Sequence, residues 1–279
     1  MKIGIAGLGL MGGSMLKSLK KRTSHKCYGF NRTKEVLEKA KPYLDGVLTE
    51  QNLKDMDILF ICMSPSAAAN YARQNAPFLG KGQIICDICG VKEYVVKVME
   101  SIITPSGAHF VGCHPMAGKE VSGFDNADAR LFEGASFIIT PTQNTPLEAV
   151  EKVSQLALEM GFAQAVKAAP QEHDQIIAYT SQLAHIVSNA YAKSPTLKKR
   201  AGFSAGSFED LTRVARLDSK MWTELFLLNK DNLLTEIDLL IRNLKEYGKA
   251  LKELDKATLT ELLEVGNKKK LEDLFRNGQ

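Results

Sequence analysis

The first half of the chain alternates short apolar segments with stretches of helical periodicity. The apolar segments lie at residues 2–6, 26–30, 58–63, 83–87, 109–113 and 136–140, with a further short one at 163–168. Helical patterns occur at residues 11–19, 67–78 and 146–161, and the last should be capped by Thr145 and stopped by Gly161. Strands with almost no polar positions, alternating with helices, are typical of a parallel sheet covered on both faces. We therefore predict an α/β fold with a doubly wound, mostly parallel sheet.

The pattern changes after Pro170. Glycine becomes sparse, and long helical periodicities predict one helix over residues 171–192 and an amphipathic helix, or two in tandem, over 221–252. We place a domain boundary between residues 169 and 170, with an all-α helical domain over 170–279. A helical domain of only about 110 residues often completes its core by pairing with a second copy, so we predict a homodimer.

A glycine-rich turn, Gly7-Leu8-Gly9-Leu10-Met11-Gly12, directly follows the first apolar segment and precedes a helical pattern. Gly7 permits a tight turn, Gly9 lets the backbone approach a pyrophosphate, and Gly12 lets the helix pack close to the strand. The N-terminus of that helix offers unpaired N–H groups and a positive dipole end to the phosphates. These six residues are candidates for cofactor binding, and residues 1–169 are predicted to form a Rossmann-type dinucleotide-binding domain.

The segment after the second predicted strand indicates which dinucleotide fits. It reads Asn31-Arg32-Thr33, at the place where an acidic residue usually binds the ribose hydroxyls, about 20 residues after the glycines. A carboxylate would repel a 2′-phosphate, whereas a neutral Asn31 followed by Arg32 attracts one. These three residues are further cofactor candidates and favour NADP over NAD. In the alternative reading, Arg32 is a solvated surface charge and Asn31 bonds the ribose of NAD.

Composition narrows the range of partners. The chain has 279 residues, 44% of them hydrophobic, and a formal net charge of +4. Short basic runs at 198–200 and 268–270 fit solvated faces, and they lack the interleaved aromatic residues of nucleic-acid binders. A mild positive balance suits a small anionic substrate. No apolar run reaches the length of a membrane span, and the first segment resembles a strand rather than a signal peptide, so we expect a cytoplasmic protein.

All five cysteines lie in apolar, strand-like segments: Cys27, Cys62, Cys86, Cys89 and Cys113. An odd number in a protein that is not secreted favours reduced, buried thiols. Cys86 and Cys89 have the spacing of a redox or zinc pair, but the sequence offers no second ligand pair at metal spacing. We predict no metal site.

Polar residues follow several predicted strands, where ligands bind in open parallel sheets. Ser64 and Pro65 follow one strand, Gly90 lies after the next, and His114 follows the one after that. The first three are cofactor candidates, and His114 is the strongest catalytic candidate. Its unperturbed pKa of about 6.5 suits it to take a proton from an alcohol as hydride leaves, and we expect an apparent pKa within about a unit of that value. In the alternative reading, His114 is bonded to loop backbone.

Several of these residues also carry a family resemblance. Gly7-x-Gly9-x-x-Gly12-Gly-Ser, Asp87-Ile-Cys-Gly-Val-Lys, His114-Pro-Met-Ala-Gly-Lys-Glu-x-Ser-Gly, Glu172-His-Asp, Ser181-Gln-Leu-Ala-His and Thr212-Arg-Val-Ala followed by Met221-Trp stand in the order found in prephenate dehydrogenases. The chain resembles this family over nearly its whole length. The resemblance implies oxidative decarboxylation of prephenate to 4-hydroxyphenylpyruvate with hydride transfer to NAD(P), a step of tyrosine biosynthesis.

The resemblance also implies roles for individual residues. His114 would bind and deprotonate the ring hydroxyl of the substrate, and Arg213 would hold a substrate carboxylate. The other residues assigned to substrate binding are Ser181 and His185 on one helical face, Glu120 for gating near the arginine, Trp222 lining the pocket, and Asp174 ordering the ionic network. The chain departs from the family at Gly90, where many relatives have a serine that helps to orient the histidine or its substrate. This leaves the partner of His114 open, with a backbone group or Cys89 as candidates.

Three alternatives remain. An arogenate dehydrogenase would act on the amino analogue of prephenate, and the sequence does not separate the two. A β-hydroxyacid dehydrogenase shares the plan of the fold and often Asn-Arg-Thr after the second strand, but it generally uses a lysine base, for which we find no matching motif. A non-enzymatic NADP-sensing protein is disfavoured by the combination of His114, Arg213, His185 and Glu120.

Overall fold

The computed structural model describes residues 1–276. The chain divides into two compact units, Met1–Lys230 and a second unit that begins at Asp231. The predicted boundary at residues 169 and 170 lies inside the first unit, at the start of helix α6 (Pro170–Ile177). The first unit therefore contains the sheet together with the first helices that follow it.

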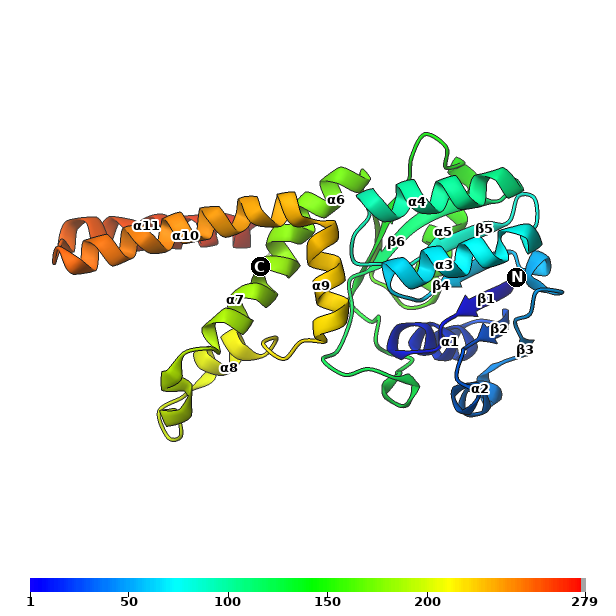
Figure 1. The fold of residues 1–279 in the computed structure, drawn as a ribbon, viewed down its shortest axis with the longest axis horizontal. Helices are drawn as coiled ribbons and strands as arrows, with labels where there is room; N and C mark the ends of the chain where they lie inside the picture. The colour runs from blue at the N-terminus through cyan, green and yellow to red at the C-terminus, as the bar shows by residue number, and fades with distance from the viewer. Residues whose placement is uncertain (277–279) are drawn as a thin grey trace. The chain divides into compact units, whose positions relative to one another are not determined.

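An eight-stranded sheet forms the centre of the first unit (Figure 1). All neighbouring strands are parallel except β6 and β7, which are antiparallel. The predicted doubly wound, mostly parallel sheet is thus confirmed. In sheet order the strands are β3 (Gly46–Val47), β2 (Lys26–Phe30), β1 (Lys2–Ala6), β4 (Ile58–Ile61), β5 (Ile84–Asp87), β6 (His109–Pro115), β7 (Ser136–Thr140) and β8 (Gln164–Lys167).

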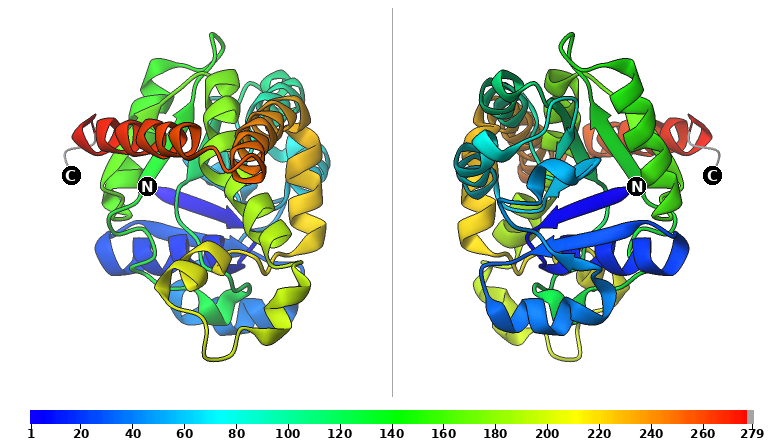
Figure 2. Two further views of the ribbon diagram at one scale, coloured as in Figure 1. Left: turned by 90° about the vertical axis from the view of Figure 1, so that its left-hand side faces the viewer. Right: turned by 90° about the vertical axis from the view of Figure 1, so that its right-hand side faces the viewer.

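Helices cover both faces of this sheet, as the apolar strands require (Figure 2). One face packs against α1 (Leu10–Arg22), α2 (Lys34–Ala40) and α5 (Leu147–Glu159), and the other against α3 (Pro65–Asn75) and α4 (Glu93–Ile103). β4 is buried along its whole length between the two layers. The carboxyl ends of the parallel strands are left at one edge, where the loops to the helices lie.

The ends of two predicted helices differ in detail from the prediction. The helix expected at 67–78 begins at Pro65, because proline fits the first helical position, and its last turn tightens to a 3-10 helix. The N-cap of α5 is Pro146 rather than Thr145, whose hydroxyl instead accepts a hydrogen bond from the N–H of Thr142. Gly161 ends the helix as expected, with a left-handed φ of +94°.

The helix predicted over residues 171–192 is present but interrupted. It consists of α6 (Pro170–Ile177), a π-helical turn (Ala178–Leu183) and α7 (Ala184–Tyr191). A short helix, α8 (Gly206–Thr212), follows, and α9 (Ser219–Leu228) ends the helical part of the first unit. The pattern over 221–252 corresponds to two helices in tandem, since α9 stops before α10 (Lys230–Lys252) begins.

The second unit consists of most of α10 together with α11 (Lys256–Arg276), which the sequence pattern did not predict. Large apolar side chains lie exposed along both helices, namely Leu234, Leu239, Ile241, Leu244, Leu251, Leu263, Val265 and Leu271. A helical pair with this much exposed apolar surface is typical of a protein–protein interface. Along residues 1–276, every helix is too short or too polar to cross a membrane.

Candidate active site

The glycine-rich turn joins β1 to α1 with the geometry that the sequence predicted. Gly7 has a left-handed φ of +99°, and a β-carbon there would overlap the carbonyl oxygen of Cys62, the residue directly after β4. A β-carbon on Gly12 would overlap the carbonyl oxygen of Gly7, so the helix can approach the turn only because Gly12 has no side chain. At Gly9, no atom lies within 4 Å of the position that a β-carbon would take, which leaves the backbone there open to a ligand.

The groups around this turn fit the phosphates of a dinucleotide. No side chain caps the N-terminus of α1 at Gly9, and the first turn of that helix contains no acidic residue. Asn31 Oδ1 accepts a hydrogen bond from Leu8 N–H at 3.1 Å, and Asn31 Nδ2 donates to the carbonyl of Thr33 at 3.4 Å. The Asn31 side chain thus fixes the turn itself, while Arg32 and Thr33 are exposed beside it.

The remaining cofactor candidates come to the same edge of the sheet. Ser64 is the N-cap of α3 and Pro65 its first residue, directly after β4, and Gly90 lies between β5 and α4. Because β2, β1, β4 and β5 are neighbours in the sheet, these residues and the glycine turn line one continuous edge. A carboxylate oxygen of Glu224 on α9 accepts the N–H of Ser66 there at 2.6 Å, a contact that the sequence analysis did not foresee.

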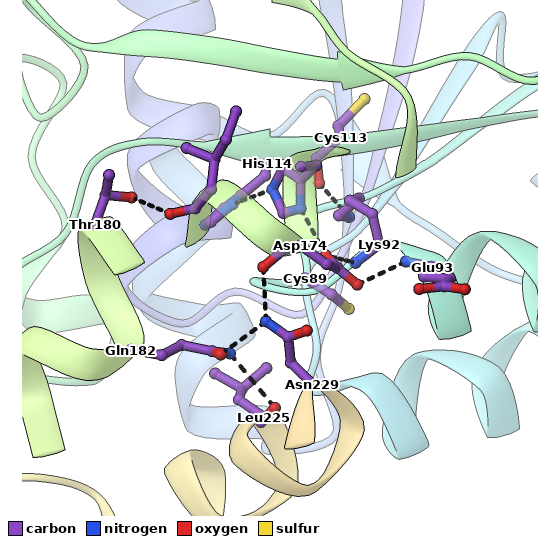
Figure 3. A network of polar contacts seen from close by, with 12 residues as sticks. Cys89, Lys92, Glu93, Cys113, His114, Asp174, Thr180, Gln182, Leu225 and Asn229 are labelled. Carbon is purple, nitrogen blue, oxygen red and sulfur yellow. Dashed lines mark hydrogen bonds and ion pairs between the residues drawn. The ribbon is translucent and has the colours of Figure 1, made fainter. Parts of the chain in front are cut away.

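His114 lies on β6 near the end of the strand and begins a chain of hydrogen-bonding side chains (Figure 3). Its Nδ1 is 2.9 Å from Nε2 of His173 on α6. Nδ1 of His173 is in turn 2.7 Å from Oδ1 of Asp174. His173 and Asp174 are each only 1% exposed, whereas His114 is partly exposed. His173 is therefore the partner of His114 that the sequence analysis sought in a backbone group or Cys89.

Asp174 is held from several sides. Oδ1 also accepts the N–H of Lys92 at 2.7 Å, and Oδ2 accepts the N–H of Glu93 at 2.9 Å, which caps the N-terminus of α4. The backbone carbonyl of Asp174 accepts a hydrogen bond from Asn229 at 2.8 Å (Figure 3). Both carboxylate oxygens of Asp174 are thus taken by donors within the protein.

A second buried charge lies behind His114. The ammonium group of Lys92, which is 0% exposed, forms an ion pair with Asp87 and donates to the carbonyl of Cys113 at 2.5 Å. Asp87 also accepts the N–H groups of Cys89 at 2.8 Å and Cys113 at 3.1 Å. This pair fixes the end of β5 to β6, one residue before His114.

These surroundings lower the pKa of both histidines. Burial, followed by the nearby His173 and Lys92, holds the pKa of His114 well below its ordinary value. Burial also lowers the pKa of His173, although the hydrogen bond from Asp174 opposes that shift. The expectation of an apparent pKa within about a unit of 6.5 is thereby corrected downward, because desolvation and a neighbouring cation disfavour the imidazolium. His114 is neutral at pH 7 and can accept a proton.

Ser181, His185 and Trp222 form a second cluster. His185 Nδ1 donates to the backbone carbonyl of Ser181 at 2.8 Å, so these residues do lie one helical turn apart, with Ser181 in the π-helical turn and His185 at the start of α7. The indole ring of Trp222 lies against the imidazole of His185, with ring centroids 3.9 Å apart and an interplanar angle of 31°. Trp222 is half-buried and also packs on the apolar layer under α3 and α4.

Helix α9 links this cluster to His114. Leu225 lies one turn after Trp222, and a β-carbon on Gly90 would be 3.5 Å from Leu225 Cδ1 and 3.8 Å from His114 Nε2. These are ordinary contact distances, so Nε2 faces a space beside Gly90 that a small group can enter. Cys89 points elsewhere, because its thiol donates to the carbonyl of Met63 at 3.6 Å.

Arg213 and Glu120 pair with each other. One nitrogen of the guanidinium donates to a carboxylate oxygen of Glu120, and their side chains are 67% and 43% exposed. The structure thus brings the predicted carboxylate-binding arginine and the predicted gating acid together. Among residues 1–276, no direct hydrogen bond joins this pair to the His114 chain or to the cluster around His185.

Four buried polar residues of the site had no predicted role: Asp87, Lys92, His173 and Asn229. A signal existed for three of them, since Asp87, Lys92 and His173 stand inside the motifs quoted for the family resemblance. Asn229 carries no local signal, because its contact with Asp174 spans 55 positions.

The cysteines form no disulfide, and four of them lie where burial disfavours the thiolate. All five cysteines are free, and burial raises the pKa of Cys27 to about 11 and the pKa values of Cys62, Cys86 and Cys89 further. Residues 1–276 contain no group of three or more His, Cys, Asp or Glu side chains placed to hold a metal ion.

Comparisons with known proteins agree over most of the chain. Residues 15–166 match the family described as prephenate dehydrogenase, nucleotide-binding domain, and residues 169–265 match prephenate dehydrogenase, dimerization domain. Cyclohexadienyl dehydrogenase of Zymomonas mobilis is 31% identical, over 96% of this chain and 94% of that protein. Prephenate dehydrogenase of Bacillus subtilis is 30% identical, over 91% of this chain and 71% of that protein.

Solved structures give the same picture. Prephenate dehydrogenase from A. aeolicus, in complex with hydroxyphenyl propionate and NAD+, superimposes with a TM-score of 0.84 at 27% identity, covering 98% of each chain. Synechocystis arogenate dehydrogenase superimposes with a TM-score of 0.83 at 26% identity, over 98% of this chain and 99% of that one. A 3-hydroxyisobutyrate dehydrogenase of Mycobacterium tuberculosis shares the fold alone, at 14% identity and a TM-score of 0.54. The site with its nucleotide-binding turn, the two matched domains and these relatives together show that this chain is a dehydrogenase of the prephenate dehydrogenase family.

Proposed function

We propose that this protein oxidises and decarboxylates prephenate to 4-hydroxyphenylpyruvate with NAD(P). The observation that carries the proposal is a neutral His114 at the carboxyl edge of the sheet, whose Nε2 lies 3.8 Å from the position that a β-carbon on Gly90 would take, so a small group fits beside it. The names of the relatives and the resemblance of the site motifs supply the substrate class.

His114 would first accept and later return one proton, so that protons balance over the whole reaction. The bound nicotinamide supplies the hydride acceptor. As the C–H bond at the carbinol carbon breaks, Nε2 of His114 takes the hydroxyl proton and a ring carbonyl forms. The bond from the ring to its carboxylate then breaks and carbon dioxide leaves. The electron pair of the broken bond stays with the ring, which becomes aromatic. The ring oxygen takes the proton back from His114 as a phenol, so the reaction releases no net proton.

The other candidates surround that step. Arg213 would hold a substrate carboxylate, for which the planar guanidinium is suited, after exchanging it for Glu120. Ser181 and His185 would bind the substrate, and Trp222 would line the pocket. The cofactor would lie along Gly7–Gly12 and residues 31–33, with Ser64, Pro65 and Gly90 further along the same edge.

A single assay tests the proposal. Purified protein is mixed with prephenate or arogenate, each with NAD or NADP, and formation of reduced nicotinamide is followed by absorbance. Turnover of prephenate supports the proposal, and turnover of arogenate alone identifies an arogenate dehydrogenase. Absence of turnover with both substrates would leave a β-hydroxyacid substrate or NADP sensing as the function.

NADP should be the preferred cofactor, because Arg32 is exposed beside the glycine turn and no acid stands there. We expect Arg32→Ala to lower the ratio of kcat/KM for NADP to that for NAD by about tenfold, or about 1.4 kcal/mol. The exposed neighbour Lys34 provides the control, since Lys34→Ala should leave the ratio unchanged. An unchanged ratio in Arg32→Ala would refute the assignment of Arg32 to a 2′-phosphate.

The protein should form a homodimer through its dimerization domain. Leu244 on α10 is 60% exposed, and burying such side chains is the usual driving force for helical pairing. We expect Leu244→Glu to shift the light-scattering mass at micromolar concentration from dimer toward monomer. Asn243→Glu, which adds a charge at the adjacent exposed position, should leave the dimer intact. A wild-type protein that is monomeric at that concentration would contradict the prediction.

A further inference from the structure

We propose that His173 is a positioning residue that fixes the tautomer of His114, and that Asp174 fixes the tautomer of His173 in turn. The inference extends the proposed function, since it concerns how the base of that reaction is prepared. It rests on the two short contacts that join β6 to α6, from Nδ1 of His114 to Nε2 of His173 and from Nδ1 of His173 to Oδ1 of Asp174.

The direction of the chain follows from Asp174. Its carboxylate already accepts N–H groups of Lys92 and Glu93, so both oxygens act as acceptors. A carboxylate in this position can only accept from the imidazole, and Nδ1 of His173 must therefore carry a proton. In the neutral ring the lone pair then lies on Nε2 of His173.

The same rule applies at the next link. Because Nε2 of His173 is an acceptor, Nδ1 of His114 must donate to it across 2.9 Å. Neutral His114 then has its lone pair on Nε2, the atom that faces the space beside Gly90. The lone pair of His114 thus lies on the side where a substrate hydroxyl can reach it. An orienting acid has the same effect on the histidine of a catalytic triad.

The environment keeps this arrangement in place. The charged groups that face the two rings are Lys92 and Asp87 from the end of β5 and the loop after it, and Asp174 from α6. Lys92 disfavours a second proton on either ring, while Asp174 attracts only the proton on Nδ1 of His173. His173 is almost completely buried, so water does not compete for its Nε2.

Two substitutions of His173 separate positioning from mere packing. In His173→Gln, the amide oxygen can still accept from Nδ1 of His114, and we expect kcat within a few-fold of wild type. In His173→Phe, the ring is retained but the acceptor is lost, and we expect kcat to fall roughly ten- to a hundredfold. The KM for NADP should change in neither variant, because the glycine turn is untouched. Wild-type kcat in the Phe variant would overturn the proposal.

The tautomer itself can be read by ¹⁵N NMR of histidine-labelled protein, with the His114 signals assigned from His114→Asn. We expect His114 in the wild type to carry its proton on Nδ1, and in His173→Phe to move it largely to Nε2. A wild-type protein in which His114 carries its proton on Nε2 would refute the proposal, whether or not the Phe variant folds. Because this readout needs no substrate, it is independent of the activity test, and failure of prephenate turnover would refute the proposed function alone.

Discussion

His114→Asn should lower kcat by roughly 10²–10⁴-fold while leaving the fold and cofactor binding intact. The amide of asparagine can take over the contact that Nδ1 makes with His173, but it has no group at the position of Nε2. The variant therefore keeps the local hydrogen bond and loses only the base. We would measure kcat and KM with prephenate, cofactor binding by fluorescence, and the folded state by circular dichroism.

The pH profile gives the second readout of the same prediction. Because burial, His173 and Lys92 lower the pKa of His114, the neutral base persists as the pH falls. We expect the acid-side fall in kcat to occur below pH 6.5 in the wild type and to disappear in His114→Asn. His109, at the opposite end of β6, supplies a matched control, and His109→Asn should keep both kcat and the profile. Near-normal kcat in His114→Asn would move the base to another group, and His185 would be tested next.

Arg213→Ala should raise the KM for the substrate roughly 10- to 150-fold and leave the KM for the cofactor nearly unchanged. The estimate corresponds to the loss of a charge-assisted hydrogen bond, about 1.5–3 kcal/mol. The ion-pair partner of Arg213 is Glu120, so removing the guanidinium leaves the glycine turn and the contact between Leu8 and Asn31 intact, and the KM for the cofactor should not change. Steady-state kinetics with each substrate varied in turn provides the measurement.

The nearby exposed Arg216 offers the control for Arg213. Arg216→Ala changes the same net charge in the same segment and should alter the substrate KM by much less. If both variants raise it equally, long-range attraction of an anion explains the effect. If Arg213→Ala raises both Michaelis constants equally, Arg213 does not act on the substrate carboxylate.

Much of the fold was predictable because its signals are local. The strands of the sheet are fully apolar, and the turn at Gly7 and Gly12 requires glycine for steric reasons that adjacent residues already reveal. Helix α11 was missed because its sequence is strongly charged, with Lys268–Lys270 on an exposed surface, and lacks a clear apolar stripe.

The site was predictable only as a set of residues. The motifs indicated His114, Arg213, His185 and Glu120, but spacing could not show which side chains meet. His114 and His173 are 59 positions apart and are joined only when α6 packs behind β6. The lowered pKa of His114 depends on the same tertiary contact and on the buried Lys92, so the reference value for a free histidine was a poor guide.

Asp174 also joins two properties of the protein that often oppose each other. The same carboxylate caps the first turn of α4 and accepts from His173, so one side chain would contribute both to folding stability and to the state of the proposed base. At many active sites a strained or charged group lowers stability, and its replacement gains stability at the expense of activity. At position 174, replacing the aspartate should lower both stability and activity. Random mutagenesis followed by selection for thermostability should therefore retain the aspartate even without any selection for turnover.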